Sequence, residues 1–236
     1  MKEALRAGRP INKILIAEGS DSGPLREIFS MARNAGIPVQ RVDRQRLNKY
    51  VPETAHQGVV ALAAAREYVE VEDILQAVPP GEDPLLMLLD EIHDPHNLGA
   101  ILRTAEAAGI HGVIIPRRRS VPLTQAVAKS SAGAVEYVPV ARVTNLPATM
   151  EDLKKRGLWI AGADAGGKEL YWDAPLDGPL ALVVGGEGKG LGRLVKERCD
   201  ILVRFPMHGR VNSLNASVAA ALFAYEVLRQ RRKALK

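Results

Sequence analysis

The fold is decided by residues 85–105, LLMLLDEIHDPHNLGAILRTA. The apolar run Leu85–Leu89 is typical of a strand buried on both faces, and a polar turn follows it. Further apolar residues then recur at helical spacing: Leu98, Ile101, Leu102 and Ala105. Asn97 is placed to cap this helix, and Arg103 lies off its apolar face. Open α/β sheets bind ligands where a strand ends and a helix begins, although an ordinary capped helix with a solvated arginine gives the same pattern.

Four more short apolar runs follow along the chain, and helical stretches separate most of them. They lie at residues 112–115, 158–161, 180–184 and 201–203. Strands that alternate with helices predict an α/β fold whose mostly parallel sheet is covered by helices on both faces.

The run at 180–184 leads into a glycine-rich loop, GGEGKGLG, at residues 185–192. Such a loop, beginning at Gly185, lets the backbone approach a ligand closely with its amides free to donate. Lys189 is followed by glycine rather than by Ser or Thr, so the loop is not a P-loop. With Glu187 at its centre the loop suits a small polar ligand without phosphates. A flexible surface turn is the alternative.

A third polar stretch, FPMHGRVNSLNASVAAA, occupies residues 205–221. It follows the last apolar run, and either Ser213 or Asn215 is expected to begin a helix. Small residues dominate that helix, which would allow close packing within the chain or across a dimer: Ala216, Ala219, Ala220 and Ala224. A buried alanine-rich helix explains these residues but leaves the polar cluster at 208–215 unexplained.

Residues 1–69 predict a separate small α/β domain. Its expected elements are strands at 13–17, 37–39 and 58–65 and a helix at 25–34. Residues 70–84 are acidic and then contain Pro-Pro-Gly, which is typical of a linker. Residues 85–236 would then form the second domain.

Composition narrows the class of protein. The chain has 236 residues, a net charge of +5 and 25% charged residues, as in ordinary globular proteins. It contains no apolar run long enough to cross a membrane and no signal peptide, so we expect a soluble, cytoplasmic protein. The single cysteine, Cys199, excludes an internal disulfide and is expected to be a small buried side chain. The basic excess suggests a nucleic-acid partner.

Two further clusters have competing interpretations. His93 and His96, beside Asp90, Glu91 and Asp94, resemble a metal site. Pro95 disfavours the one-face helical geometry that the two histidines would need, and we expect no metal. The run of three arginines at residues 117–119 is either a solvated loop or a phosphate contact.

Taken together, DPHNLGAILRTA, GGEGKGL and FPMHGRVNSLNASVA resemble the three motifs of the SpoU-type (TrmH-like) RNA ribose 2′-O-methyltransferases of the SPOUT superfamily. They occur in the family's order, each at a strand end, within residues 85–228. The N-terminal segments EALRAGR, KILIAEG and HQGVVA resemble the small ribosomal-protein-L30e-like domain that binds the RNA substrate. That domain precedes the catalytic one in the branch that methylates a guanosine of 23S ribosomal RNA.

The resemblance implies an α/β knot, in which the C-terminal segment threads a deep trefoil and S-adenosylmethionine binds in the knot. It also implies a homodimer, which would give the alanine-rich helix a role at the interface. The cofactor-binding positions of the family fall on Gly185, Phe205 and Leu214. Phe205 stands where isoleucine is commoner, which changes the shape of the pocket. The polar active-site positions fall on five residues: Asn97, Arg103, Glu187, Ser213 and Asn215.

The resemblance makes Arg103 the candidate for activating the ribose hydroxyl. Since a guanidinium is ordinarily protonated, Arg103 would act either as a base with a depressed pKa or as an orienting group. Two other functions remain open: a transfer-RNA 2′-O-methyltransferase, and an RNA-binding protein that has kept the fold without catalysis. The L30e-like domain argues against the first and the intact polar residues argue against the second.

Overall fold

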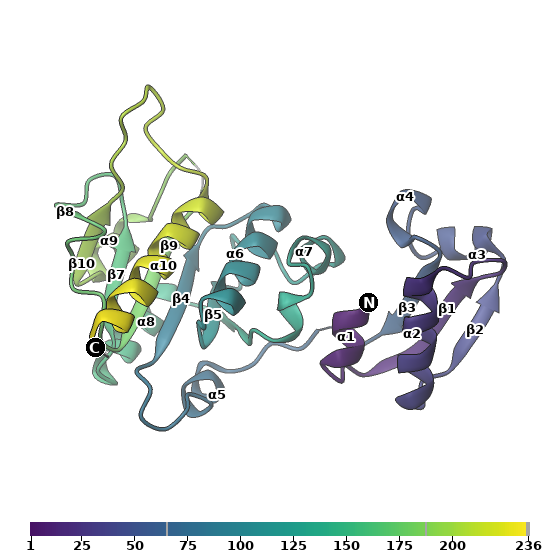
Figure 1. The fold of residues 1–236 in the computed structure, drawn as a ribbon. Coiled ribbons are helices and arrows are strands. Elements are labelled where there is room, and N and C mark those ends of the chain that lie inside the picture. The colour runs from purple at the N-terminus through teal and green to yellow at the C-terminus, as the bar shows by residue number, and fades with distance from the viewer. Residues whose placement is uncertain (65, 187, 235–236) are drawn as a thin grey trace. The chain divides into compact units, whose positions relative to one another are not determined.

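The computed structural model describes residues 1–64, 66–186 and 188–234. The chain divides into two compact units, Met1–Glu67 and Tyr68–Lys236 (Figure 1). Each unit has its own sheet and its own buried apolar clusters. Within the described residues, no helix is both long enough and apolar enough to cross a membrane.

The smaller unit is built on a three-stranded sheet in the order β2-β1-β3, with β1 parallel to β2 and antiparallel to β3. Its elements are α1 (Lys2–Arg6), β1 (Ile11–Ala17), α2 (Gly23–Asn34), β2 (Val39–Val42), α3 (Arg44–Asn48), α4 (Glu53–His56) and β3 (Val59–Ala63). Ile14 and Ile16 of β1 pack with α1 and α2 on one face, and Leu15 packs with α3 on the other.

The second strand of this unit begins later than the sequence suggests. The expected strand was Ile37–Val39, whereas β2 runs over Val39–Val42. Pro38 has no N–H, so it enters the ladder through its carbonyl alone, which accepts from Ile14 N at 2.9 Å. The expected third strand included Ala65, which lies outside the described residues.

The larger unit contains a seven-stranded sheet in the order β6-β5-β4-β9-β7-β10-β8, and every neighbouring pair is parallel. The strands are β4 (Leu85–Asp90), β5 (Gly112–Pro116), β6 (Val140–Val143), β7 (Trp159–Ala163), β8 (Glu169–Leu170), β9 (Leu180–Gly185) and β10 (Ile201–Arg204). The five apolar runs of the sequence are β4, β5, β7, β9 and β10, which confirms the predicted α/β class. The short strands β6 and β8 were not predicted.

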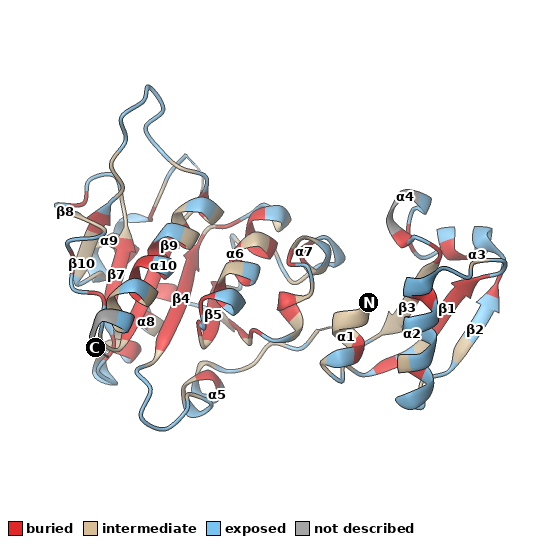
Figure 2. Ribbon diagram, viewed as in Figure 1, coloured by how far each residue is buried: buried red, intermediate tan, exposed pale blue. Residues whose placement is uncertain are grey.

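Helices cover both faces of this sheet. They are α5 (Val71–Gln76), α6 (Pro95–Ala107), α7 (Gln125–Ser130), α8 (Leu146–Lys155), α9 (Arg193–Arg198), α10 (Ala216–Ala234) and the 3-10 helix η1 (Ala134–Glu136). Leu85, Met87 and Leu89 pack under α6, α7, η1 and α10 on one face, whereas Leu86 and Leu88 pack under α5, α8 and α9 on the other. Strand β4 is therefore buried along its whole length, which explains its unbroken apolar run (Figure 2).

The stretch 70–84, which composition marks as a linker, contains α5. The side chain of Ile74 on this helix is buried in the same apolar cluster as Leu86 and Ile114. Gly112 makes room for it, because a Cβ at Gly112 would lie 2.5 Å from Ile74 Cγ2. Glu72 and Asp73 stay exposed, so an acidic composition does not prevent the helix from packing through its apolar side.

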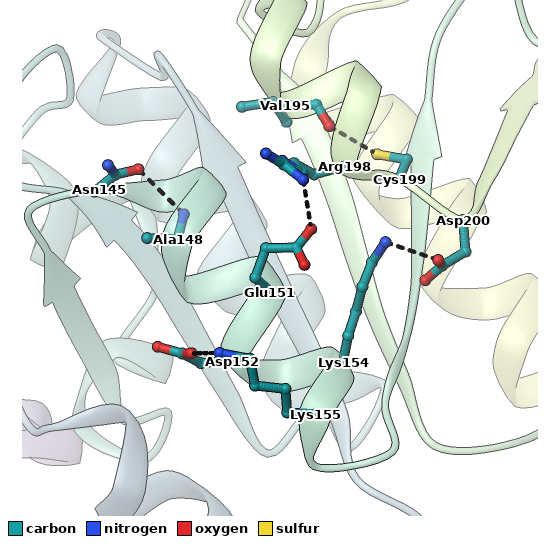
Figure 3. Close-up of polar contacts among 10 residues, drawn as sticks. All are labelled: Asn145, Ala148, Glu151, Asp152, Lys154, Lys155, Val195, Arg198, Cys199 and Asp200. Atoms are coloured by element: carbon teal, nitrogen blue, oxygen red, sulfur yellow. Dashed lines mark hydrogen bonds and ion pairs between the residues drawn. The ribbon is translucent and has the colours of Figure 1, made fainter.

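Helices α8 and α9 lie side by side and are joined by polar contacts (Figure 3). Arg198 Nη1 pairs with Glu151 Oε1 at 3.3 Å, and Lys154 Nζ pairs with Asp200 Oδ1 at 2.8 Å. Cys199 lies between Arg198 and Asp200 in the chain and packs against the core, and burial raises the pKa of its thiol to about 12. The thiol therefore stays protonated at neutral pH and acts as a small apolar group.

Candidate functional site

The polar motifs meet at the edge of the larger sheet where its parallel strands end. Strands β4 and β9 are neighbours in register, so Asp90 at the end of β4 lies opposite Gly185 at the end of β9. The loop after β4 and the glycine-rich loop therefore leave the sheet side by side. This is the edge at which open α/β sheets bind ligands.

Asp90 joins these two loops directly. Its Oδ2 accepts a hydrogen bond from Gly192 N at 2.7 Å, although the two residues are 102 positions apart. The side chain is buried, and desolvation raises the pKa of its carboxyl while the Gly192 amide opposes that rise. The sequence pattern suggests only that Asp90 resembles a metal ligand, and it gives no indication of this contact. An acidic residue directly after five buried apolar ones is the signal that could have found it.

Close backbone contacts hold the first part of the glycine-rich loop. A Cβ at Gly185 would lie 2.3 Å from the carbonyl carbon of Gly190, and a Cβ at Gly186 would lie 2.4 Å from the carbonyl oxygen of Glu91. Gly190 has a φ of +64°, which favours glycine. The described part of the loop is therefore a packed turn at its base rather than a flexible one. Glu187, the predicted polar centre of the loop, lies outside the described residues.

Asn97 does not cap α6, contrary to expectation. The cap is Asp94, whose Oδ1 accepts from His96 N at 2.9 Å, and Pro95 occupies the first helical position. Proline is favoured there because its missing N–H has no partner to lose. Asn97 consequently lies within the first turn, with its side chain buried.

Asn97 instead contacts the third motif. Asn215 Nδ2 donates to Asn97 Oδ1 at 2.9 Å, across 118 positions of sequence. The side-chain oxygen of Asn215 at the same time accepts from Ser217 N at 2.9 Å and from Ser217 Oγ at 2.6 Å, so this side chain begins α10. Of the two predicted helix starts, Ser213 and Asn215, Asn215 is confirmed.

The remaining polar candidates are exposed. Arg103 projects from α6 to solvent, as its helical position predicted, and forms no hydrogen bond or ion pair with another residue in the described part of the chain. Ser213 is exposed and Leu214 half-buried in the loop between β10 and α10, which extends away from the sheet in Figure 1. The structure thus brings Asn97 and Asn215 into contact, whereas among the described residues neither Arg103 nor Ser213 is hydrogen-bonded to either of them.

Phe205, just after β10, belongs to an aromatic cluster. Its ring centroid lies 4.8 Å from that of Tyr171 and 6.2 Å from that of Phe223 on α10. Tyr171 was not singled out by sequence reasoning, because it lies after the short strand β8, which has no apolar pattern. The segment beyond Tyr171 is bonded to α10 through Gln230, whose Oε1 accepts from Leu176 N at 2.8 Å.

The described residues contain no cluster of three or more His, Cys, Asp or Glu side chains that could hold a metal ion. Asp90, which would belong to such a site beside His93 and His96, is turned toward the Gly192 amide instead.

Comparison with known proteins agrees with this architecture. Residues 84–225 match the SpoU rRNA Methylase family, and residues 1–69 match the family described as RNA 2′-O ribose methyltransferase substrate binding. A relative from Bacillus subtilis (strain 168), assigned to the TrmH family of tRNA/rRNA methyltransferases, is 50% identical over 230 residues, which is 97% of this chain and 92% of the relative.

Solved structures show the same fold. The SpoU methyltransferase AviRb from Streptomyces viridochromogenes, in complex with AdoMet, is 28% identical with a TM-score of 0.83 and covers 98% of this chain and 87% of its own. A second solved structure, whose description concerns the 2-OH methylation of C/U34 on tRNA, is 27% identical with a TM-score of 0.58. The match covers 64% of this chain and 98% of that chain. The family matches cover both units, and the position of the three motifs at one sheet edge agrees with them. The chain therefore belongs to the SpoU rRNA methylase family.

Proposed function

We propose that this chain transfers the methyl group of S-adenosylmethionine to a ribose 2′-hydroxyl of RNA. The observation that carries the proposal is the junction of the three motifs at one sheet edge, through Asp90 with Gly192 and Asn97 with Asn215. Family membership supports the reaction, and the AdoMet complex of AviRb supports the identity of the methyl donor.

The residues at this edge fit such a cofactor. S-adenosylmethionine carries an aromatic base and an amino-acid end but no phosphate, so it needs main-chain hydrogen-bonding groups and apolar surface rather than a cluster of cations. The glycine-rich loop supplies main-chain groups at glycines, which carry no side chain of their own, Phe205 supplies an aromatic ring, and Leu214 supplies a half-buried apolar side chain. We assign Gly185, Phe205 and Leu214 to cofactor binding. The trefoil knot expected from the resemblance remains a prediction.

Bound at this edge, the cofactor supplies an electrophilic methyl group. A ribose hydroxyl attacks it well only when its proton is held or removed in the transition state. Because Arg103 is exposed to solvent and its planar guanidinium donates in a fixed geometry, we assign it the orienting role: its N–H groups would hold the 2′-oxygen and the neighbouring phosphate, and the hydroxyl proton would pass to solvent water. Holding the hydroxyl in line with the methyl group supplies much of the acceleration.

The other polar residues have supporting roles in this proposal. Asn97 and Asn215 connect the start of α6 to the start of α10, so they set the distance between the first and third motifs. Ser213, two residues before Asn215, would shape the turn that faces the cofactor. Glu187 would position Arg103, as the resemblance implies.

We propose a guanosine of 23S ribosomal RNA as the substrate. The match of residues 1–69 to a substrate-binding family supports a large RNA target, because this unit adds an RNA-binding surface beyond the catalytic unit. The structure whose description concerns 2-OH methylation on tRNA matches 64% of this chain, so more residues than the smaller unit contains have no counterpart in it. Transfer RNA is the alternative substrate.

We also propose that the chain forms a homodimer through α10. Of the two expected uses of the small residues, packing within the chain is the one observed: Ala216, Ala220 and Ala224 are buried against α6 and the sheet, and Ala219 is partly buried beside them. The opposite side of α10 exposes larger apolar side chains one helical turn apart: Val218, Leu222 and Tyr225. An exposed apolar stripe of this kind is typical of a protein interface.

Transfer of labelled methyl from S-adenosylmethionine to unmodified 23S rRNA, with unmodified tRNA in parallel, tests the function. Label on a guanosine 2′-oxygen of 23S rRNA is the expected result. Label on tRNA alone would contradict the proposed substrate, and label on neither RNA would overturn the proposed function.

Arg103→Ala should abolish turnover and leave cofactor affinity nearly unchanged. Loss of cofactor binding in this variant would contradict the assigned role of Arg103.

A further inference from the structure

A loop rich in arginine follows β5 at the same sheet edge as the proposed site. We call residues 117–123 the arginine loop; it begins with Arg117, Arg118 and Arg119, all of them exposed. Strand β5 is the parallel neighbour of β4, so the arginine loop and the first motif leave adjacent strand ends. None of these three arginines has a catalytic or cofactor-binding role in the proposed function.

Contacts with the first motif hold the arginine loop on one side. Arg119 Nη1 pairs with Glu91 Oε1 at 2.9 Å, and Val121 N donates to the Ile92 carbonyl at 2.9 Å. Glu91 and Arg119 both have positive φ, at 58° and 60°, a conformation that non-glycine residues adopt when the surrounding contacts enforce it. The loop is therefore held in one conformation against the motif that begins α6.

A second set of contacts braces the two ends of the arginine loop. Arg142 of β6 donates through Nη2 to the Arg117 carbonyl at 2.9 Å, and its guanidinium stacks on the Tyr68 ring at 4.8 Å from the centroid. The Tyr68 hydroxyl in turn accepts from Leu123 N at 2.9 Å. Tyr68 thus supports the first residue of the loop through Arg142 and the last residue directly.

Within the described residues, the charge of the arginine loop is neutralised only at Arg119. Glu91 pairs with Arg119, but in the described part of the chain no carboxylate lies within ion-pair distance of Arg117 or Arg118. The Arg117 side chain makes one long contact, from Nε to the Arg142 carbonyl at 3.5 Å, which orients it without cancelling its charge. Two positive charges are therefore presented on a preformed loop, and preformed loops lose little conformational entropy on binding.

We infer that Arg117 and Arg118 bind the phosphate backbone of the RNA substrate beside the methylated nucleotide. This inference rests on the proposed function, because it needs RNA at this sheet edge. Arginine suits the role, since its planar guanidinium can donate two parallel hydrogen bonds to a phosphate. These contacts recognise no base, so they position the RNA relative to Arg103 without selecting its sequence.

The test compares the salt dependence of RNA binding in three double variants. Arg117→Ala with Arg118→Ala should reduce the slope of log affinity against log salt by about 0.7–0.9 for each phosphate that the variant no longer neutralises. Arg117→Lys with Arg118→Lys keeps the charges and should keep most of the slope. Lys155→Ala with Arg156→Ala removes two charges at the C-terminal end of α8, which leads into the opposite end of the sheet, and should leave the slope unchanged.

Two further measurements separate the possible failures. Cofactor affinity and the thermal midpoint of the alanine variant should equal those of the wild type, because both side chains are exposed. This inference alone would be overturned if the wild type methylates RNA but the salt slope of the Arg117→Ala, Arg118→Ala variant is unchanged. The same conclusion would follow if that slope falls no more than in the Lys155→Ala, Arg156→Ala variant. A wild type that binds no RNA would overturn the proposed function with it.

Discussion

At the scale of single residues, Asp90 is the side chain whose role the structure changes most. The sequence presents it as one of several acids around two histidines, whereas the fold buries it and bonds it to the Gly192 amide. Burial is unfavourable for the charged carboxylate, yet the charge strengthens the hydrogen bond that holds the glycine-rich loop. Asp90 thus contributes to the proposed cofactor site through backbone position rather than through contact with a ligand.

This environment predicts a pH-dependent stability. The raised pKa means that, as pH increases, the unfolded chain releases the Asp90 proton before the folded chain does. The contribution of Asp90 to folding is therefore fully present below its unfolded pKa and is lost as pH rises through the folded pKa. Asp90→Asn keeps an oxygen acceptor for Gly192 and has no proton to release.

We expect the unfolding free energy of Asp90→Asn, relative to wild type, to be higher at pH 7 than at pH 4. Urea unfolding at the two pH values measures this difference. A difference that does not change with pH would contradict the assigned environment of Asp90.

At the scale of elements, the contact between α6 and α7 depends on a glycine. A Cβ at Gly99 would lie 1.8 Å from Ser130 Oγ and 2.9 Å from the Ser131 backbone nitrogen. Gly99→Ala should therefore push α7 away from α6 and lower the unfolding free energy by about 1–3 kcal/mol, the usual cost of overpacking. Chemical denaturation measures the change. Gly178→Ala is the matched control, because no atom lies within 4 Å of its added Cβ; an equal loss in both variants would contradict this explanation.

The exposed side of α10 predicts the oligomeric state. Leu222→Glu combined with Tyr225→Glu places two charges in the proposed interface and should convert the dimer to a monomer, as measured by sedimentation equilibrium. Leu194→Glu on α9 changes a residue that is 51% exposed on another helix and should leave the dimer intact. A wild-type monomer, or a dimer unaffected by both charges, would rule out α10 as the interface.

At the scale of the whole molecule, the two units have different proposed functions: the larger one binds the cofactor, and the smaller one contributes to RNA binding. Each has its own buried clusters, and the contacts of the catalytic edge lie within Tyr68–Lys236. A fragment of residues 68–236 should bind S-adenosylmethionine within about twofold of the full chain. Its RNA affinity should fall by about a hundredfold, because linked binding modules gain factors of that order from effective concentration. Calorimetry with cofactor and filter binding with RNA measure the two effects. Unchanged RNA affinity would show that residues 1–67 do not contribute to RNA binding.

The fragment should start before the acidic stretch 70–84. The composition of that stretch is typical of a linker, but Ile74 fills the space beside Gly112. Val69, just before the stretch, pairs with Ala141 of β6. A fragment that starts at residue 85 would expose this part of the core.

The sequence by itself determined the α/β class, five of the strands in the larger sheet and the outward direction of Arg103, and it narrowed the start of the last helix to Ser213 or Asn215. Each of these depends on neighbouring residues: a run of apolar side chains, helical spacing, or a polar side chain that bonds to amides two or three residues ahead. The family resemblance came from the same local information, because each motif is a contiguous run of residues.

Tertiary structure alone decided which distant residues meet. The bonds of Asp90 with Gly192 and Asn97 with Asn215 cross more than a hundred positions, and the burial of Ala216, Ala220 and Ala224 depends on where α10 returns to the sheet. The bracing of Arg117 by Arg142 likewise depends on the pairing of β5 with β6. Residue type and spacing limit which groups a side chain can bond. The order of strands in the sheet selects the partner, because that order determines which strand ends, and therefore which loops, lie side by side.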